Sequence, residues 1–189
     1  LQDIGYEIYA EVLDSANYGL PQHRKRIYIV GFDKRTIDSP IGFHWPEPLE
    51  KDTFIGQFVE ANVNDRSISK HLQDSYLFKL DDGRPQVIDR RSKIKVKTLV
   101  ASYHKIQRLT GTFVADGPTG LRLLTDNECK AIMGFPTDFI IPVSRTQMYR
   151  QMGNSVAVPV IGAIALEIST VLVAHGVLKE KQSNAKRSA

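Results

Sequence analysis

The chain has 189 residues, of which 42% are hydrophobic, enough for one hydrophobic core or for one core with a small appended lobe. Its net charge of +4 favours an anionic partner. A single cysteine, Cys129, excludes an intramolecular disulfide and a cysteine-based zinc site, and no signal peptide is visible, so we expect a cytoplasmic protein without a metal site.

Two strand-like runs open the chain. Residues 7–13 alternate between apolar and polar side chains, which predicts a half-buried strand. Residues 27–32 are continuously apolar, which is typical of a strand covered on both faces. The basic pentapeptide Gln22–Arg26 (Gln-His-Arg-Lys-Arg) lies between them, at the entrance to the second strand, so we expect it to be held by structure on both sides.

Three prolines, Pro40, Pro46 and Pro48, mark an expected domain boundary, after which residues 46–121 read as an irregular, mostly β lobe. Within this lobe, residues 84–108 hold eight Lys or Arg and one acid, a charge of +7, so that the rest of the chain carries −3. Such a concentrated basic stripe suggests nucleic acid as the partner. A solvated, lysine-rich loop is the alternative.

Two helices are expected near the C-terminus. Thr125 and Glu128 have the spacing of a capping box, and Gly134 ends the first helix. Residues 156–178 predict a long buried helix, and Glu167 near its middle argues against a membrane span. The polar residues 179–189 are expected to form a flexible tail.

Three segments, in this order, resemble motifs of the C-terminal part of the C5-cytosine-specific DNA methyltransferase family. Gln22–Arg26 resembles the Gln-x-Arg-x-Arg motif that leads into a core strand, and 122–136 resembles the motif that organises the recognition lobe. Gln151-Met-Gly-Asn-Ser-Val matches the family's last motif. The resemblance covers the chain from about Ile4 to Leu178.

The resemblance implies an α/β fold: the C-terminal portion of a Rossmann-like, S-adenosylmethionine-dependent methyltransferase sheet, with a small, mostly β target-recognition domain. It also implies a bacterial, nucleoid-associated enzyme, either restriction-linked or orphan. The expected domains are the last strands of the catalytic domain (1–45), the target-recognition domain (46–121), the motif helix and connection (122–145), the helix that returns to the catalytic domain (146–178) and the tail (179–189).

Arg24 and Arg26 are the first candidate site residues. At a spacing of two in an extended segment, their planar guanidinium groups face the same way and can grip a phosphate or the edge of a flipped base. By resemblance, Arg26 reaches into the active site and holds the flipped cytosine, while Gln22 and Arg24 support it. Taken alone, the pentapeptide is also compatible with a charge-rich surface turn.

Asn154 and Ser155 are the candidate cofactor residues. We expect them at a helix N-terminus, where exposed N–H groups and the helix dipole suit a carboxylate. By resemblance, this position closes over S-adenosylmethionine. A simple helix cap is the alternative. Arg122 in the preceding motif is assigned only a supporting polar role.

The recognition lobe supplies the candidate DNA contacts. Lys93, Lys95 and Lys97 alternate with apolar residues, and in a strand they would form one row of ammonium groups suited to a phosphate backbone. The solvated face of an edge strand is the equal alternative. The dipeptide Thr98-Leu99 resembles the Thr-Leu of the family's lobe. Base readout is expected from four residues that follow: Tyr103, His104, Gln107 and Arg108.

The first part of the family pattern is absent from this sequence. There is no Gly-x-Gly, no Pro-Cys nucleophile and no Glu-Asn-Val, for which 60–63 is only a near-miss. Because the reaction needs a thiolate to add to C6 of cytosine, we expect no methyl transfer by this chain alone. Its expected partners are double-stranded DNA and the missing N-terminal catalytic half, which completes the S-adenosylmethionine site.

A stand-alone DNA-binding or regulatory subunit derived from the same fold is the second hypothesis. Such a protein would need polar faces where the family packs against its catalytic sheet. Ile27, Ile29 and Ile164 are apolar instead, which favours a part of a larger enzyme and predicts self-association of the isolated chain.

Overall fold

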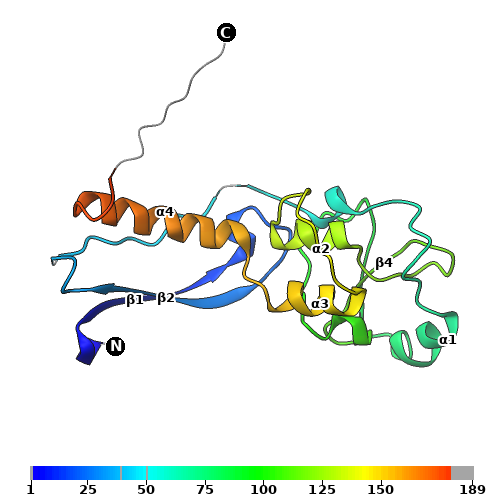
Figure 1. Ribbon diagram of the computed structural model, residues 1–189. Helices are drawn as coiled ribbons and strands as arrows, with labels where there is room; N and C mark the ends of the chain where they lie inside the picture. The colour runs from blue at the N-terminus through cyan, green and yellow to red at the C-terminus, as the bar shows by residue number, and fades with distance from the viewer. Residues whose placement is uncertain (1, 39, 50, 180–189) are drawn as a thin grey trace, which may run out of the picture. The chain divides into compact units, whose positions relative to one another are not determined.

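The computed structural model describes residues 2–38, 40–49 and 51–179 (Figure 1). The chain forms two compact units, which are considered separately. Unit 1 comprises Leu1–Val12, Ile27–Glu47 and Gly162–Ala189, and unit 2 comprises Leu13–Arg26 and Pro48–Ile161. The pentapeptide around Gln22 therefore clusters with the lobe that follows, and the expected tail falls, except for Lys179, outside the described residues.

Unit 1 contains most of a two-stranded sheet formed by β1 (Tyr6–Asp14) and β2 (Lys25–Asp33), preceded by the short helix η1 (Gln2–Ile4). An aromatic cluster packs on one side of β2, with the ring centroids of Phe32 and Phe43 5.6 Å apart and those of Tyr9 and Phe43 5.1 Å apart. β1 and β2 confirm both expected strands. Their β-branched and aromatic residues suit a pleated surface.

One face of β2 is open, in contrast to the expectation that both faces are covered. Val30 and Phe32 are 8% and 4% exposed, whereas Ile27 and Ile29 on the other face are 64% and 59% exposed. The strand therefore alternates between the aromatic cluster and solvent. An apolar side chain gains about 1.5–3 kcal/mol from burial, so this face is available for a partner.

Helix α4 (Val158–Ala174) is the long helix expected over 156–178, with Pro159 in its first turn where the missing N–H costs little. It is only partly buried, since Ile164 and Val171 are 5% exposed and Leu166 is 66% exposed. Among the described residues no single helix is long and apolar enough to cross a membrane, although the helix Arg145–Asn154 and α4 pass by length and composition when taken together as a bent pair.

Unit 2 is built mainly from irregular chain. Strands β3 (Gln86–Ile88) and β4 (Thr112–Val114) have three residues each and pair in parallel, with Gln86 opposite Thr112. The expected mostly β lobe is therefore wrong for the described part of 46–121. Its chain is held by backbone hydrogen bonds between loops, such as that from the Ile68 N–H to the Leu121 carbonyl, and by bonds from side chains to backbone carbonyls, as at Gln73 and Arg108. The remaining elements are η2 (Ser15–Tyr18), η3 (Ile55–Phe58), α1 (Lys70–Leu72), the π-helical η4 (Gln73–Leu77), η5 (Tyr103–Lys105), α2 (Asp126–Met133) and α3 (Arg145–Asn154).

Helix α2 begins and ends at the residues that the sequence indicates. The Thr125 hydroxyl accepts from the Glu128 N–H at 3.1 Å, and the Glu128 carboxylate accepts from the Thr125 N–H at 2.7 Å, which together make the capping box. Gly134 ends the helix with a φ of 77°, a left-handed conformation that glycine adopts without strain. Cys129 is fully buried on this helix, and burial raises the pKa of its thiol well above the ordinary value.

A buried ion pair anchors α2 in the core of unit 2. Arg122 and Glu128 are both 0% exposed, and two nitrogens of the guanidinium donate to the two carboxylate oxygens at 2.9 Å each. The remaining three donors of Arg122 reach Asp116 Oδ2 at 3.0 Å, the Glu60 carbonyl at 2.8 Å and the Leu123 carbonyl at 3.1 Å. Because every donor is directed, the pair fixes where segments 60 and 116 lie against the helix.

We predict that Glu128→Gln lowers the free energy of unfolding by about 3–5 kcal/mol, because it removes the main counter-charge of a buried guanidinium. Urea unfolding of the full chain measures this change. The exposed carboxylate Glu47 provides a matched control, and Glu47→Gln should change stability by less than about 0.5 kcal/mol. Equal stability of the two variants would contradict the role given to the pair.

Candidate functional site

Gln22 joins the pentapeptide to two distant segments. It is 0% exposed, its Oε1 accepts from the Leu99 N–H at 2.6 Å, and its Nε2 donates to the Ile132 carbonyl at 3.3 Å. A short parallel bridge runs beside it, in which the His23 N–H donates to the Val96 carbonyl at 3.0 Å. The buried amide therefore has a partner on each side, and it holds the Thr98-Leu99 dipeptide next to the pentapeptide.

Arg24 extends this connection to the loop between α3 and α4. It is 4% exposed, its Nη1 donates to the Leu99 carbonyl at 3.0 Å, and its Nη2 donates to the carbonyls of Gly153 and Ser155 at 3.0 and 2.8 Å. The guanidinium fork suits this task because its donors lie in one plane and point in fixed directions. One side chain thus brings the pentapeptide, the Thr-Leu dipeptide and the Gly-Asn-Ser segment together.

Arg26 differs from Arg24 in its exposure and in its hydrogen-bond partners. It is exposed, and its Nη1 donates to the carbonyl of the adjacent Lys25 at 2.7 Å. The expectation that both guanidinium groups face the same way is therefore wrong. The period of two applies within a strand, but β2 begins only at Lys25, so Arg24 lies in the preceding turn.

Gly153 and Asp14 are two positions that the sequence interpretation missed. A Cβ at Gly153 would lie 2.2 Å from the Ala101 nitrogen, so only glycine lets α3 approach residues 100–101 this closely. The sequence carries no signal for this role, because a helix is expected only over 156–178 and not over 145–154, where the structure has α3. Asp14 Oδ1 accepts from the Arg24 N–H at 2.9 Å, and its Oδ2 lies 3.1 Å from His23 Nδ1, which fixes the turn before β2.

Asn154 and Ser155 lie at the C-terminal end of α3, which corrects the expected position at a helix N-terminus. Ser155 is the C-cap, with an extended backbone, and its N–H donates to the Met152 carbonyl at 3.3 Å. Helix α4 begins three residues later at Val158. Ser144 caps α3, so the helix includes the whole Gln-Met-Gly-Asn segment. The exposed Asn154 side chain still faces solvent beside a loop that Arg24 fixes.

The three lysines of the recognition lobe do not form the expected strand. Within 93–97 only Val96 takes part in a bridge, and Ile94 lies in a bend. Lys95 Nζ donates to the Ala16 carbonyl and Lys97 Nζ to the Leu109 carbonyl, each at 3.2 Å, while Lys93 is exposed. Each bonded ammonium retains two further donors, so phosphate contact from these positions stays a proposal.

Two of the four expected base readers are buried. Tyr103 is 3% exposed, its hydroxyl donates to the Thr112 carbonyl at 2.6 Å, and burial raises its pKa. Arg108 is 8% exposed and donates to the carbonyls of Leu77 and Leu80 at 2.9 and 3.0 Å. Because these donors bond to carbonyls within the fold, the expectation that Tyr103 and Arg108 read bases is corrected.

The other expected contacts lie nearer the surface. His104 and Gln107 are half-buried, and Gln107 Oε1 accepts from the hydroxyls of Ser102 and Thr110. Thr98 is half-buried with its hydroxyl donating to the His23 carbonyl at 2.8 Å, whereas Leu99 is 4% exposed. The dipeptide therefore serves mainly to join the lobe to the pentapeptide.

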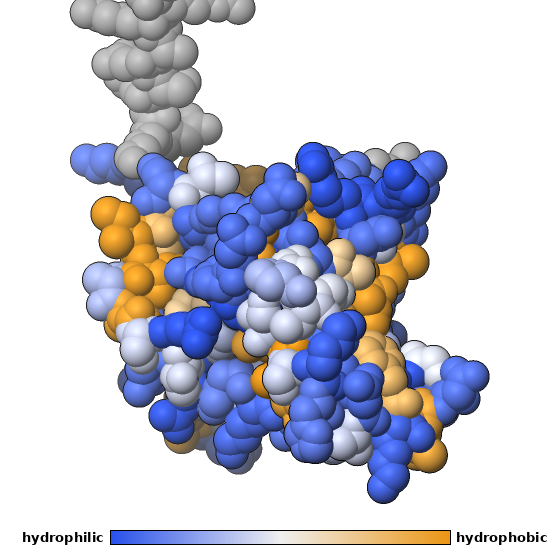
Figure 2. Space-filling model, turned by 90° about the vertical axis from the view of Figure 1, so that its right-hand side faces the viewer, coloured by the Kyte–Doolittle hydropathy of each residue, from blue (hydrophilic) through white to orange (hydrophobic). Residues whose placement is uncertain are grey.

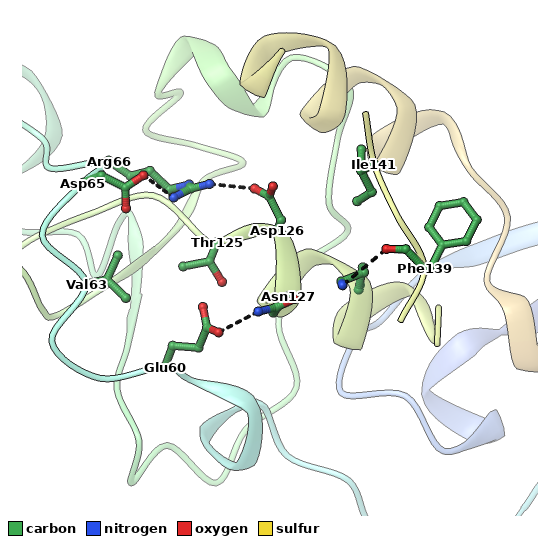
Figure 3. Close-up of a pocket in the computed structure, with 10 residues that line it drawn as sticks. Glu60, Val63, Asp65, Arg66, Thr125, Asp126, Asn127, Phe139 and Ile141 are labelled. Atoms are coloured by element: carbon green, nitrogen blue, oxygen red, sulfur yellow. Dashed lines mark hydrogen bonds and ion pairs between the residues drawn. The ribbon is translucent and has the colours of Figure 1, made fainter. Parts of the chain in front are cut away.

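A cavity of about 440 Å³ lies at the start of α2, and no residue of the pentapeptide lines it (Figure 3). Arg66 points between Asp65 and Asp126, and Asn127 donates to the Glu60 carboxylate at 2.8 Å. Lys130 Nζ donates to the Thr137 carbonyl at 2.6 Å. The charged groups of this cavity are bonded to one another, to Asn127 or to backbone carbonyls, and none of the candidate catalytic, cofactor-binding or DNA-binding residues lines it.

Comparisons with known proteins agree with the motifs. A family model described as C-5 cytosine-specific DNA methylase matches residues 1–170. The chain is 59% identical to the type II methyltransferase M.MspI of Moraxella sp over 172 residues, and 58% identical to M.BsuFI of Bacillus subtilis over 165 residues. These matches cover 91% and 87% of this chain but 40% of each relative, so the chain spans about two fifths of their length.

Solved structures show a similar fold. The Entamoeba histolytica methyltransferase EhMeth is 24% identical with a TM-score of 0.66, and the match covers 92% of this chain and 55% of that one. The S. pombe Dnmt2 methyltransferase is 17% identical with a TM-score of 0.67, covering 92% and 59%. At such low identity the likeness establishes the mixed α/β fold alone.

We predict that Arg24→Lys lowers the free energy of unfolding by about 2–4 kcal/mol, because one ammonium cannot reach the positions of both Nη atoms and leaves buried carbonyls without donors. Arg26→Lys is the matched control two residues away on an exposed side chain, and it should cost less than about 0.5 kcal/mol. Denaturant unfolding compares the two variants, and equal costs would refute the distinction between them.

Proposed function

Because the chain belongs to the C-5 cytosine-specific DNA methylase family, we propose that it is the C-terminal, DNA-recognising part of a DNA (cytosine-5-)-methyltransferase. The complete enzyme transfers a methyl group from S-adenosylmethionine to C5 of a flipped cytosine. The observation that carries the proposal is the convergence of the pentapeptide, the Thr-Leu dipeptide and the last family motif on Arg24, which bonds to Leu99, Gly153 and Ser155. The remaining three fifths of the relatives' length supplies the nucleophile and most of the cofactor site.

Arg26 is the residue of this chain that contacts the flipped cytosine. Its guanidinium is exposed, stands at the start of β2 and is bonded only to a neighbouring carbonyl among the described residues. A flipped base is read on its polar edge by directed donors, and a guanidinium presents two of them side by side. Gln22 and Arg24 act as positioning residues, since their buried bonds fix the segment that leads into β2, where Arg26 lies.

Asn154 and Ser155 form one wall of the S-adenosylmethionine site. When bound, this cofactor supplies the electrophilic methyl group. The residues fit such a role in part: the Asn154 amide is exposed, and the Ser155 carbonyl is held by Arg24 at 2.8 Å. The amide can donate to a carboxylate, while the rest of the site belongs to the part of the enzyme outside this chain.

The recognition lobe contacts double-stranded DNA through its basic segment. Lys93, Lys95 and Lys97 contact phosphates, which gives affinity without sequence information, and His104 and Gln107 stay as candidates for base contacts. The side of unit 2 that carries α1 and β4 is largely hydrophilic, with hydrophobic side chains in separate smaller patches (Figure 2). A surface of this kind suits a polyanion with a wet interface.

A chimera tests the function. The region of M.MspI that matches this chain is replaced by the 189 residues, and methyl transfer from labelled S-adenosylmethionine to plasmid DNA is measured. We expect transfer by the chimera and none by the chain alone, because the thiolate comes from the M.MspI part. Arg26→Ala in the chimera should reduce turnover about a hundredfold, since one transition-state contact is lost.

Three outcomes are informative. Transfer by the chain alone would contradict the assignment of the nucleophile to the other part. A soluble chimera that binds S-adenosylmethionine but transfers nothing would contradict a recognition role for this chain. Full activity of the Arg26→Ala chimera, with the exposed Lys25→Ala as a control for lost charge, would contradict the contact with cytosine.

A non-catalytic, stand-alone subunit is the second candidate function, and the open face of β2 argues against it. Ile27 and Ile29 are 64% and 59% exposed, and Val12 on β1 is 56% exposed. We predict that the isolated chain self-associates and binds a hydrophobic dye, and that Ile27→Thr with Ile29→Thr reduces both. Lys25→Thr on the same strand should change neither, and a monomeric wild-type chain without dye binding would favour the stand-alone protein.

A further inference from the structure

The turn formed by residues 89–92 is tightly bonded. Asp89 Oδ1 accepts from the Arg91 N–H and from the Ser92 hydroxyl, both at 2.9 Å, and the Asp89 N–H donates to Ser92 Oγ at 2.9 Å. A backbone bond from the Ser92 N–H to the Asp89 carbonyl at 3.2 Å closes the turn. Hydrogen bonds from the Ser92 hydroxyl and from the Arg91 N–H lower the pKa of Asp89. Arg90 and Arg91 are therefore presented at the tip of a preformed turn.

The turn is also seated on a neighbouring element of unit 2. The Gly56 N–H donates to the Ser92 carbonyl at 3.1 Å, and the N–H of the fully buried Ile55 donates to the Ile94 carbonyl at 3.0 Å. A Cβ at Gly56 would lie 2.8 Å from the carbonyl oxygens of both Arg90 and Ser92. Only glycine permits this close approach. Contact with η3 therefore fixes the position and orientation of the turn.

The charge of the two arginine side chains is only partly offset by their surroundings, where the attraction between Arg91 and Asp89 contributes to the lowered pKa of Asp89. They line a hollow of about 220 Å³ together with three acidic residues, Glu60, Asp89 and Asp116. Each acid has another partner: Glu60 accepts from Asn127 at 2.8 Å, Asp116 accepts from Arg122 at 3.0 Å, and Asp89 closes the turn. Within residues 2–38, 40–49 and 51–179, no hydrogen bond or ion pair involves either guanidinium.

We propose that the Arg90–Arg91 turn is a specificity-determining DNA contact of the recognition lobe, positioned by Asp89, Ser92 and Gly56. The inference rests on the proposed function and names the residues that carry it out. One guanidinium donates two hydrogen bonds to the major-groove edge of a guanine, and the adjacent one binds a phosphate. Both contacts need an exposed, unpaired fork on a rigid backbone, which distinguishes these arginines from the buried Arg24, Arg108 and Arg122.

Duplex DNA binding by the full 189-residue chain tests the proposal. The probe is a pool of fluorescent 30-base-pair duplexes of random sequence, from which the wild-type chain first selects a preferred sequence, and affinity is then measured at several salt concentrations. We expect Arg90→Ala and Arg91→Ala each to weaken binding to the selected duplex about tenfold or more. One variant relaxes the preference at a base position, and the other lowers the salt slope by about 1.

Conservative variants separate geometry from charge. Arg90→Lys and Arg91→Lys keep the charge and the fold but lose the fork, so the base-reading position should lose discrimination while the phosphate position retains most of its affinity. Gly56→Ala keeps both arginines and displaces the turn, and it should reduce specific binding as much as the alanine variants do. Gly162→Ala is the matched control, because its Cβ would meet no atom within 4 Å.

The results separate the proposed role of the Arg90–Arg91 turn from the proposed function of the chain. Suppose that the wild-type chain binds a selected duplex and that Arg90→Ala and Arg91→Ala bind it with the same affinity as the wild type and the exposed-charge control Lys34→Ala. The role of the arginine turn is then refuted, and the proposed function survives. If the wild-type chain binds no duplex DNA at any salt concentration, both fail. If Gly56→Ala does not fold, the two lysine variants still decide the role of the turn.

Discussion

The hydrogen bonds of Arg24 are the constraint on which the candidate site depends. Three carbonyl groups that lie 75, 129 and 131 residues further along the chain converge on one guanidinium. A buried charged group whose donors lost these partners would cost several kcal/mol, so the three segments cannot shift independently. Gly153 adds a second condition, because a Cβ there would lie 2.2 Å from the Ala101 nitrogen.

Six arginines of unit 2 fall into two classes with different tasks. Arg24, Arg108 and Arg122 are 4%, 8% and 0% exposed, and their donors are directed at carbonyls or carboxylates of the fold. Arg26, Arg90 and Arg91 are exposed at the ends of segments that other bonds hold in place. The first class fixes the backbone, and the second presents charge where a polyanion can reach it.

The sequence predicts correctly those structural features that depend only on residues close together in the chain. The capping box at Thr125 and Glu128 and the end of α2 at Gly134 need only a few consecutive residues, and all are found. The two strands around the pentapeptide are likewise found, because short apolar runs bounded by turn residues specify them. The family resemblance, carried by three short motifs, is confirmed by the match over residues 1–170.

Errors arose where the outcome depends on distant partners. Arg24 and Arg26 have the same residue type two positions apart, and only the carbonyls of Leu99 and Gly153 decide that one is buried. The sequence predicts Asn154 at a helix N-terminus, whereas the cap at Ser144 begins a helix that ends there. The sequence predicts Arg108 as a base reader, since nothing local shows that the carbonyls of Leu77 and Leu80 accept from its donors.

The most direct test of this account is amide hydrogen exchange of the full chain, compared between the wild type and Arg24→Lys. If Arg24 holds three segments together, exchange should accelerate at 98–101 and 153–156, while the Glu128 amide, which donates to Thr125 at 3.1 Å, keeps its protection. Unchanged exchange at both segments, or a uniform increase over the whole chain, would contradict a site organised by this one side chain.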